Sequence, residues 1–175
     1  MSRQPTLMPR DFVVALKFAM NPNRRFTFAA LAEDLALAAS EVHTSVKRST
    51  LAGLLLMDSS LGTMAIKPAI REFALYGVRY AFPAIHGPMT RGMVTGAAGP
   101  VLRGVLQQTN DESVVWPYAK GTARGPSLLP LYPRLPLAAE RDLGLYEALT
   151  LIDSIRIGGA RERQLAAEAV LKRLS

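Results

Sequence analysis

Apolar and polar residues alternate with the period of an α-helix over the first third of the chain. Apolar side chains recur at three- or four-residue spacing in Asp11–Met20, Phe28–Leu35 and Ser40–Gly53, as they do on the buried face of an amphipathic helix. Thr27 stands directly before the second segment and Ser40 opens the third, so we expect these hydroxyls to cap the two helices. The pattern predicts three short helices that pack as one compact unit.

A β-hairpin and a fourth helix are predicted next. Leu54–Met57 and Thr63–Ile66 have the composition of short strands, and the intervening Asp58–Gly62 has that of a turn. Apolar positions in Lys67–Tyr76 again follow the helical period. Gly77 is the expected C-cap of this helix, because glycine tolerates the left-handed conformation that ends many helices.

The segment from Pro83 to Pro136 holds seven glycines and eight prolines, a density that resists long helices. We therefore expect turns, short strands and extended loop there. Residues 128–136 (LLPLYPRLP) suit either an extended arm that lies across a neighbouring surface or a linker that packs in cis, since prolines preset the conformation.

Aromatic and basic residues gather between Val114 and Gly125. We expect Trp116 to anchor this loop onto the domain. Alternatively, Trp116 and Tyr118 stack on a nucleic-acid strand or form a protein-binding surface. Lys120 and Arg124 would then neutralise the charge of the partner.

Two amphipathic helices are predicted at the end of the chain, over Arg141–Ile157 and Arg161–Leu174, joined at Gly158-Gly159. Such a hairpin either closes the core or forms a dimer. The whole pattern predicts an α+β fold that is mainly α. Its three parts are an N-terminal unit (1–82), a Gly/Pro-rich irregular segment (83–140) and a C-terminal helical hairpin (141–175).

Charge points to the kind of partner. The 175 residues include 21 Lys and Arg against 14 Asp and Glu, for a formal net charge of +7. The whole excess lies before residue 135, because residues 135–175 hold six basic and six acidic side chains. A basic balance favours a polyanionic partner. Nucleic acid is the first expectation and an anionic membrane surface the second.

Composition and motifs disfavour catalysis. The absence of cysteine removes disulfides, thiolate metal sites and cysteine nucleophiles, and no HExxH, GxGxxG, Walker-type or GxSxG motif occurs. The acidic residues that could serve in catalysis are expected to be ordinary solvated carboxylates: Glu33, Asp34, Asp111, Glu112 and Glu140. We expect a protein that is not an enzyme and that has no cofactor or metal. No apolar run is long enough to span a membrane, so we expect a cytoplasmic protein.

Residues 27–54 (TFAALAEDLALAASEVHTSVKRSTLAGL) carry a more specific pattern. Small and apolar residues stand at defined positions: Ala32 at the helix crossing, Leu35 and Leu37 around the turn, Val42 and Val46 on an inward face, and Gly53-Leu54 at the exit. This segment resembles the helix-turn-helix of winged-helix bacterial transcriptional regulators, the broad group that contains MarR-like and GntR-like proteins. With its flanking helix and hairpin, the resemblance covers about residues 10–66. It departs at Ala36, where glycine is usual, and at Ser49, where an apolar residue is usual.

The resemblance implies a DNA-binding surface centred on the third predicted helix. The candidate DNA-binding residues are Arg24, Arg25, Thr27, Ser40, His43, Thr44, Lys47 and Arg48. The three polar residues at the start of that helix would reach base edges or adjacent phosphates, and its two cations would hold the phosphate backbone. The arginine pair before the second helix would meet phosphates from the flank.

We therefore expect a sequence-specific regulator that binds double-stranded DNA. A homodimer is implied by the resemblance, because two-fold regulators read paired half-sites. The alternative is a protein-interaction module, such as an antitoxin or an assembly subunit, in which residues 83–175 bind a protein partner.

Overall fold

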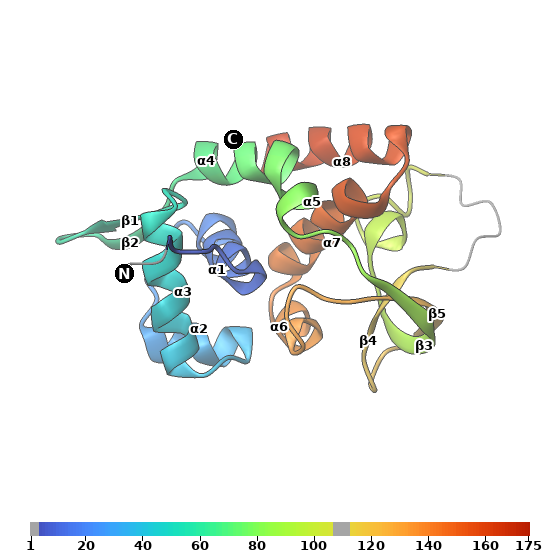
Figure 1. Cartoon of the computed structure of the whole chain (residues 1–175), viewed down its shortest axis with the longest axis horizontal. Helices are drawn as coiled ribbons and strands as arrows, with labels where there is room; N and C mark the ends of the chain where they lie inside the picture. Colours follow the sequence, from blue (N-terminus) through green and yellow to red (C-terminus); the bar gives the residue numbers. More distant parts are fainter. Residues whose placement is uncertain (1–3, 107–112) are drawn as a thin grey trace.

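A computed structural model describes residues 4–106 and 113–175, which form an α+β structure (Figure 1). Helix α1 (Pro9–Met20) has proline at its first position, where a helix needs no N–H donor. It is buried from Asp11 to Ala19. Because helices α3 and α7 both contact it, α1 lies at the centre of the packing.

Helix α2 (Phe28–Leu35) has the predicted bounds and the predicted cap. Thr27 Oγ1 accepts a hydrogen bond from the Ala30 N–H at 3.1 Å. After the helix, Ala36 adopts a left-handed conformation with φ 51° and ψ 41°. Alanine therefore holds the turn conformation for which glycine is normally preferred.

Helix α3 (Ala39–Leu51) begins two residues earlier than expected, with Ala38 in place of Ser40 as its N-cap. The prediction that Ser40 caps this helix is wrong, because Ser40 lies within its first turn. The Glu41 carboxylate instead accepts a hydrogen bond from the Ala38 N–H at 3.0 Å. A glutamate at the third helical position can satisfy a helix start in this way without a hydroxyl at the N-cap.

The predicted hairpin is confirmed. Strands β1 (Leu55–Asp58) and β2 (Gly62–Ala65) pair antiparallel, with Leu55 opposite Ala65 and Asp58 opposite Gly62. The Asp58 carboxylate organises the turn by accepting hydrogen bonds from the Ser60 and Leu61 N–H groups, both at 2.8 Å. Such Asx turns are a common reason for aspartate at this position.

The helix after the hairpin is longer than predicted. It runs from α4 (Lys67–Glu72) through a π-helical turn (Phe73–Gly77) into α5 (Val78–Ala81). Gly77 therefore does not end the helix, and the prediction of a C-cap there is wrong. Its role is packing, because a Cβ atom at Gly77 would stand 2.6 Å from Cδ2 of Phe73.

A small sheet follows. Strand β3 (His86–Val94) pairs antiparallel with both β4 (Val115–Pro117) and β5 (Ala123–Leu128). Strands β4 and β5 also meet in parallel at Val115 and Ser127, which closes the three strands into a barrel. A short 3₁₀ turn (Gly96–Ala98) leads away from β3 and contacts α7. The predicted short strands are thus confirmed.

Three helices complete the chain: α6 (Leu135–Arg141), α7 (Leu143–Ile157) and α8 (Ala160–Arg173). The predicted helical hairpin with its turn at Gly158-Gly159 is confirmed. Residues 128–136 pack in cis, because Leu131 and Tyr132 are buried in the core. The alternative of an extended arm on a neighbouring molecule is therefore wrong for these residues.

One hydrophobic core runs through the described residues, from Phe12 in α1 to Leu174 at the end of the chain. Figure 1 shows α7 in the middle of the molecule, between the N-terminal helices and the small sheet. Its residues Leu145 and Leu149 are fully buried. The boundaries predicted after residues 82 and 140 therefore do not divide the core.

Within the described ranges, no helix is both long and apolar enough to cross a membrane. The longest α-helix among the described residues, α7, has 15 residues, whereas a spanning helix needs about 20. Asp111 and Glu112, predicted to be solvated carboxylates, lie outside the described residues.

Candidate nucleic-acid interface

Helix α3 presents one polar stripe to solvent. Four of the predicted DNA-binding residues lie exposed on it at three- or four-residue spacing: Ser40, His43, Thr44 and Lys47. On the opposite side Val42 and Val46 are buried against the core. The Thr44 hydroxyl donates to the Ser40 carbonyl at 2.8 Å, which leaves its oxygen as an acceptor. The stripe thus combines hydroxyl, imidazole and ammonium groups, which are suited to base edges and phosphates.

Arg48 does not belong to this stripe. Its Nε and Nη2 donate to the two carboxylate oxygens of Asp11 at 2.6 and 2.8 Å. Asp11 is fully buried, and the hydrogen bond that Arg48 donates to this carboxylate raises the pKa of Arg48. These contacts do not support the predicted role of Arg48 at the DNA backbone, because a bidentate pair with a buried acid engages it in tying α3 to α1.

Two more contacts hold α3 against α1. The Ser49 hydroxyl is buried and donates to the Asp11 carbonyl at 2.9 Å, which accounts for a polar residue where the resemblance expects an apolar one. Arg10 and Glu41 form an ion pair at 2.6 Å. These bonds hold the backbone of α3 against α1 from the side opposite to the exposed stripe.

The residues before α2 differ in their surroundings. Arg24 donates to the Asp34 carboxylate at 2.6 Å, and its guanidinium lies 4.4 Å from the centroid of the Phe26 ring. Its side chain is half exposed but already paired. Arg25 and Thr27 are exposed, and the Thr27 oxygen accepts the capping bond while its proton can still be donated. Arg25 is therefore the more available of the two arginines for a phosphate.

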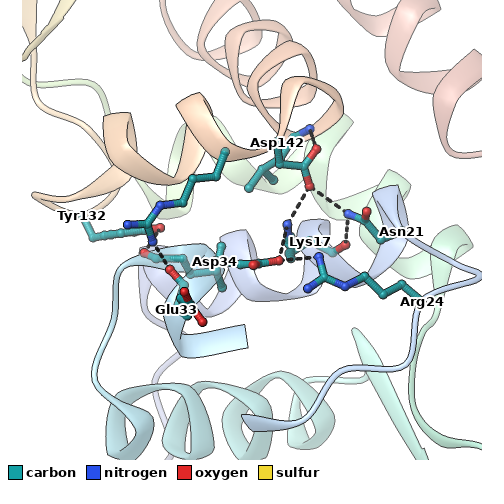
Figure 2. Close-up of polar contacts among 10 residues, drawn as sticks. Lys17, Asn21, Arg24, Glu33, Asp34, Tyr132 and Asp142 are labelled. Carbon is teal, nitrogen blue, oxygen red and sulfur yellow. Dashed lines mark hydrogen bonds and ion pairs between the residues drawn. The ribbon is translucent and has the colours of Figure 1, made fainter. Parts of the chain in front are cut away.

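A buried lysine, which the sequence analysis did not identify, lies behind Arg24 (Figure 2). Lys17 is 1% exposed, and its Nζ stands 2.8 Å from Asp142 and 3.0 Å from Asp34. Asn21 donates to the same Asp142 oxygen at 2.9 Å. The cluster joins α1, α2 and the start of α7. No pattern in the sequence marked Lys17, because it lies outside the apolar face of the predicted helix and its partners are distant in sequence.

The two carboxylates of this cluster are stabilised in their ionised form. Burial alone would raise the pKa of Asp142, but hydrogen bonds from Lys17, the Leu145 N–H and Asn21 outweigh it and lower the pKa. Burial likewise opposes the lower pKa of Asp34, and bonds from Lys17 and Arg24 outweigh it. The cluster is therefore a charged one at neutral pH.

The carboxyl end of α2 is held by the C-terminal half of the chain. The Tyr132 hydroxyl donates to the Leu35 carbonyl at 2.9 Å, and the Arg141 guanidinium donates to the Glu33 carbonyl. The last carbonyls of a helix lack intrahelical partners. Side chains from around α6 supply them here and so fix the turn before α3.

An apolar groove of about 620 Å³ lies beside the stripe of α3. Phe28, Leu51 and Met57 line it together with His43 and Lys47. Leu51 and Met57 are 68% and 60% exposed. The candidate interface is therefore polar towards the start of α3 and apolar between the end of α3 and the hairpin.

Trp116 is a core residue. It is 1% exposed, and its Nε1 donates to Asp153 at 2.7 Å. Thr95 donates to the same carboxylate at 2.7 Å and Arg156 to its other oxygen at 2.7 Å. The expected anchoring role of Trp116 is confirmed, and stacking of its ring on a nucleic acid is ruled out by its burial.

Comparison with protein-family models, with curated protein sequences and with solved structures finds no match to this chain. Among the residues that the structure describes, no three His, Asp or Glu side chains gather as metal ligands would. The function must therefore be argued from the geometry of the α3 surface.

Proposed function

We propose that the chain is a sequence-specific DNA-binding regulator that uses residues 10–66 as a winged helix-turn-helix. The carrying observation is the exposed polar stripe of α3, on a helix tied from behind to α1. The left-handed Ala36 between α2 and α3 and the hairpin after α3 support the same proposal. A rigid helix with polar side chains can enter a major groove without an ordering cost on binding.

The position of each exposed candidate residue suggests which part of the DNA it contacts. Ser40, His43 and Thr44, near the start of α3, contact base edges, and Lys47 contacts the phosphate backbone. Arg25 meets a phosphate from the flank, beside the Thr27 hydroxyl. The hairpin tip contributes no cation, because residues 58–62 (DSSLG) include no basic side chain.

A homodimer in the cytoplasm would present two copies of α3 to paired half-sites. Exposed apolar surface for this contact lies beside α8. A groove of about 410 Å³ there is lined by Tyr76, Tyr80 and Leu171, and both tyrosines are more than 70% exposed. Tyrosines in such positions are frequent at protein interfaces.

The test is fluorescence anisotropy on random duplex DNA and on the DNA upstream of the protein's own gene, each across a salt series. We expect tighter, salt-sensitive binding to the upstream DNA. Lys47→Ala should weaken both and lower the salt slope by about 1, whereas His43→Ala should reduce the preference for the upstream DNA. Lys172→Ala, an exposed cation on α8, is the matched control and should change neither.

A protein-interaction module is the second candidate, with its partner in the groove beside α3 rather than on residues 83–175, because that groove exposes apolar side chains that nucleic acid does not require. Absence of binding to either duplex at low salt would contradict the proposed function and favour this second one. In that case Leu51→Ser should leave the fold intact and reduce association with the partner.

A further inference from the structure

Two arginines face one another on the small sheet, at the far side of the molecule from α3. Arg91 on β3 stands directly opposite Arg124 on β5 in the antiparallel register, and both are exposed. Residues directly opposite one another project from the same face, with Cβ atoms about 4.5–5.5 Å apart. Like charges in this arrangement repel and destabilise a sheet.

A third cation lies at the same end of the sheet. The loop between β4 and β5 folds back onto β3, since the Tyr118 N–H donates to the Arg91 carbonyl at 3.2 Å. Gly121 lies so close to β3 that a side chain there would overlap the carbonyl of Gly92. Lys120, beside Gly121, is exposed, and its backbone lies against the end of β3 that carries the arginine pair.

Among the described residues, these three cations have no ion-pair partner. The ion pairs formed within 4.0 Å among the described residues do not include Arg91, Lys120 or Arg124. The carboxylate of Glu140 accepts a bond from the Tyr118 hydroxyl at 2.6 Å instead. Arg124 projects from the face of β5 opposite to the one on which the neighbouring Gly125 packs against Ser113.

We propose that Arg91, Arg124 and Lys120 form a phosphate-binding surface for the backbone of a nucleic acid. Phosphate oxygens between two guanidinium groups turn the repulsive pair into two charge-assisted contacts. The surface lies open along a strand, which suits a chain of phosphates better than one enclosed anion. This inference rests on the proposed function, because the nucleic acid that the surface binds is the DNA bound by α3.

The fold connects this surface to the helix-turn-helix. Helix α6 contacts α2, and its Glu140 and Arg141 reach Tyr118 on one side and Glu33 on the other. In Figure 1, α2, α6 and strands β3 to β5 follow one another along the lower edge of the molecule. The proposal requires that DNA bound by α3 extends along this edge as far as the three cations.

The experiment uses the full chain, a fluorescein-labelled random-sequence duplex and a salt series from about 50 to 200 mM. Arg91→Ala/Arg124→Ala should weaken binding and lower the slope of log K against log salt by about 2, at about 0.9 for each phosphate contact. Arg161→Ala/Lys172→Ala removes the same charge from exposed positions on α8 and should leave the slope unchanged. The melting temperature of the first variant at low salt should equal or exceed that of the unchanged chain, because a repulsive pair is removed.

Three results would overturn the inference. One is an equal loss of DNA binding in both double variants, which shows an effect of net charge alone. Another is an unchanged slope in Arg91→Ala/Arg124→Ala. The third is that Arg91→Ala/Arg124→Ala binds DNA as well as the unchanged chain does but binds vesicles of phosphatidylcholine and phosphatidylglycerol less well. That result assigns the surface to a membrane.

The two proposals fail separately. If Lys47→Ala binds DNA normally while Arg91→Ala/Arg124→Ala does not, the role of α3 is wrong and the sheet surface stands. If Arg91→Ala/Arg124→Ala binds DNA normally while Lys47→Ala does not, the role of the sheet surface is wrong and that of α3 stands.

Discussion

Lys47 and Arg48 are adjacent cations on α3 with different surroundings. Lys47 is exposed and lines the groove beside the polar stripe, whereas Arg48 binds the buried Asp11 carboxylate through two nitrogens. A cation with a buried partner belongs to the fold, because its removal leaves a charge uncompensated in the interior. A cation without such a partner is available to a ligand.

Alanine at these two positions should therefore have different effects. Arg48→Ala should lower the free energy of unfolding by about 3 kcal/mol, because Asp11 loses its partner. Lys47→Ala should change it by no more than about 0.5 kcal/mol, as exposed substitutions usually do. Urea unfolding of both variants measures this, and equal stabilities would contradict the assignment of Arg48 to the fold.

The turn between α2 and α3 decides the direction in which α3 leaves α2. It depends on Ala36, which holds a left-handed conformation that costs an L-residue about 1–2 kcal/mol. Tyr132 and Arg141 bind the last carbonyls of α2 from outside. Tertiary contacts therefore maintain a strained turn that glycine would adopt without strain.

Ala36→Gly should relieve this strain. The free energy of unfolding should rise by up to about 1 kcal/mol, because relief of the left-handed strain exceeds the added entropy of the unfolded chain. Ala29→Gly, on the exposed side of α2, is the control and should lower it by about 1 kcal/mol. Thermal unfolding distinguishes the two variants, and a loss of stability in Ala36→Gly would show that the turn is not strained.

The molecule is held together by buried charges as well as by its core. Lys17 binds Asp34 from α2 and Asp142 from α7, so one side chain joins segments at opposite ends of the sequence. Both carboxylates have lowered pKa values. Their contribution to stability is complete above the unfolded pKa of about 4 and is lost as the pH falls through the lower folded values.

Asp142→Asn should reveal this contribution. At neutral pH it should lower the free energy of unfolding by about 2 kcal/mol, because buried Lys17 loses one partner, while asparagine can still cap α7. The difference from the unchanged chain should shrink as the pH falls below about 4, because the carboxylate then protonates first in the unfolded chain and, at its lower pKa, in the native one. Urea unfolding across pH tests this. Asp58→Asn, on the exposed hairpin, should alter stability little, and a pH-independent deficit in Asp142→Asn would contradict the role of its charge.

The sequence by itself determined the local elements. Periodicity and caps are local properties, so the three N-terminal helices, the hairpin and the final helical pair follow from neighbouring residues, as does the exposure of Ser40, His43 and Thr44. Such patterns do not identify partners far along the chain. The pairing of Arg48 with Asp11, the burial of Lys17 and the packing that carries a helix through Gly77 were decided by the tertiary structure. These features depend on which side chains the completed fold brings within bonding distance, and that distance is not encoded in any one segment.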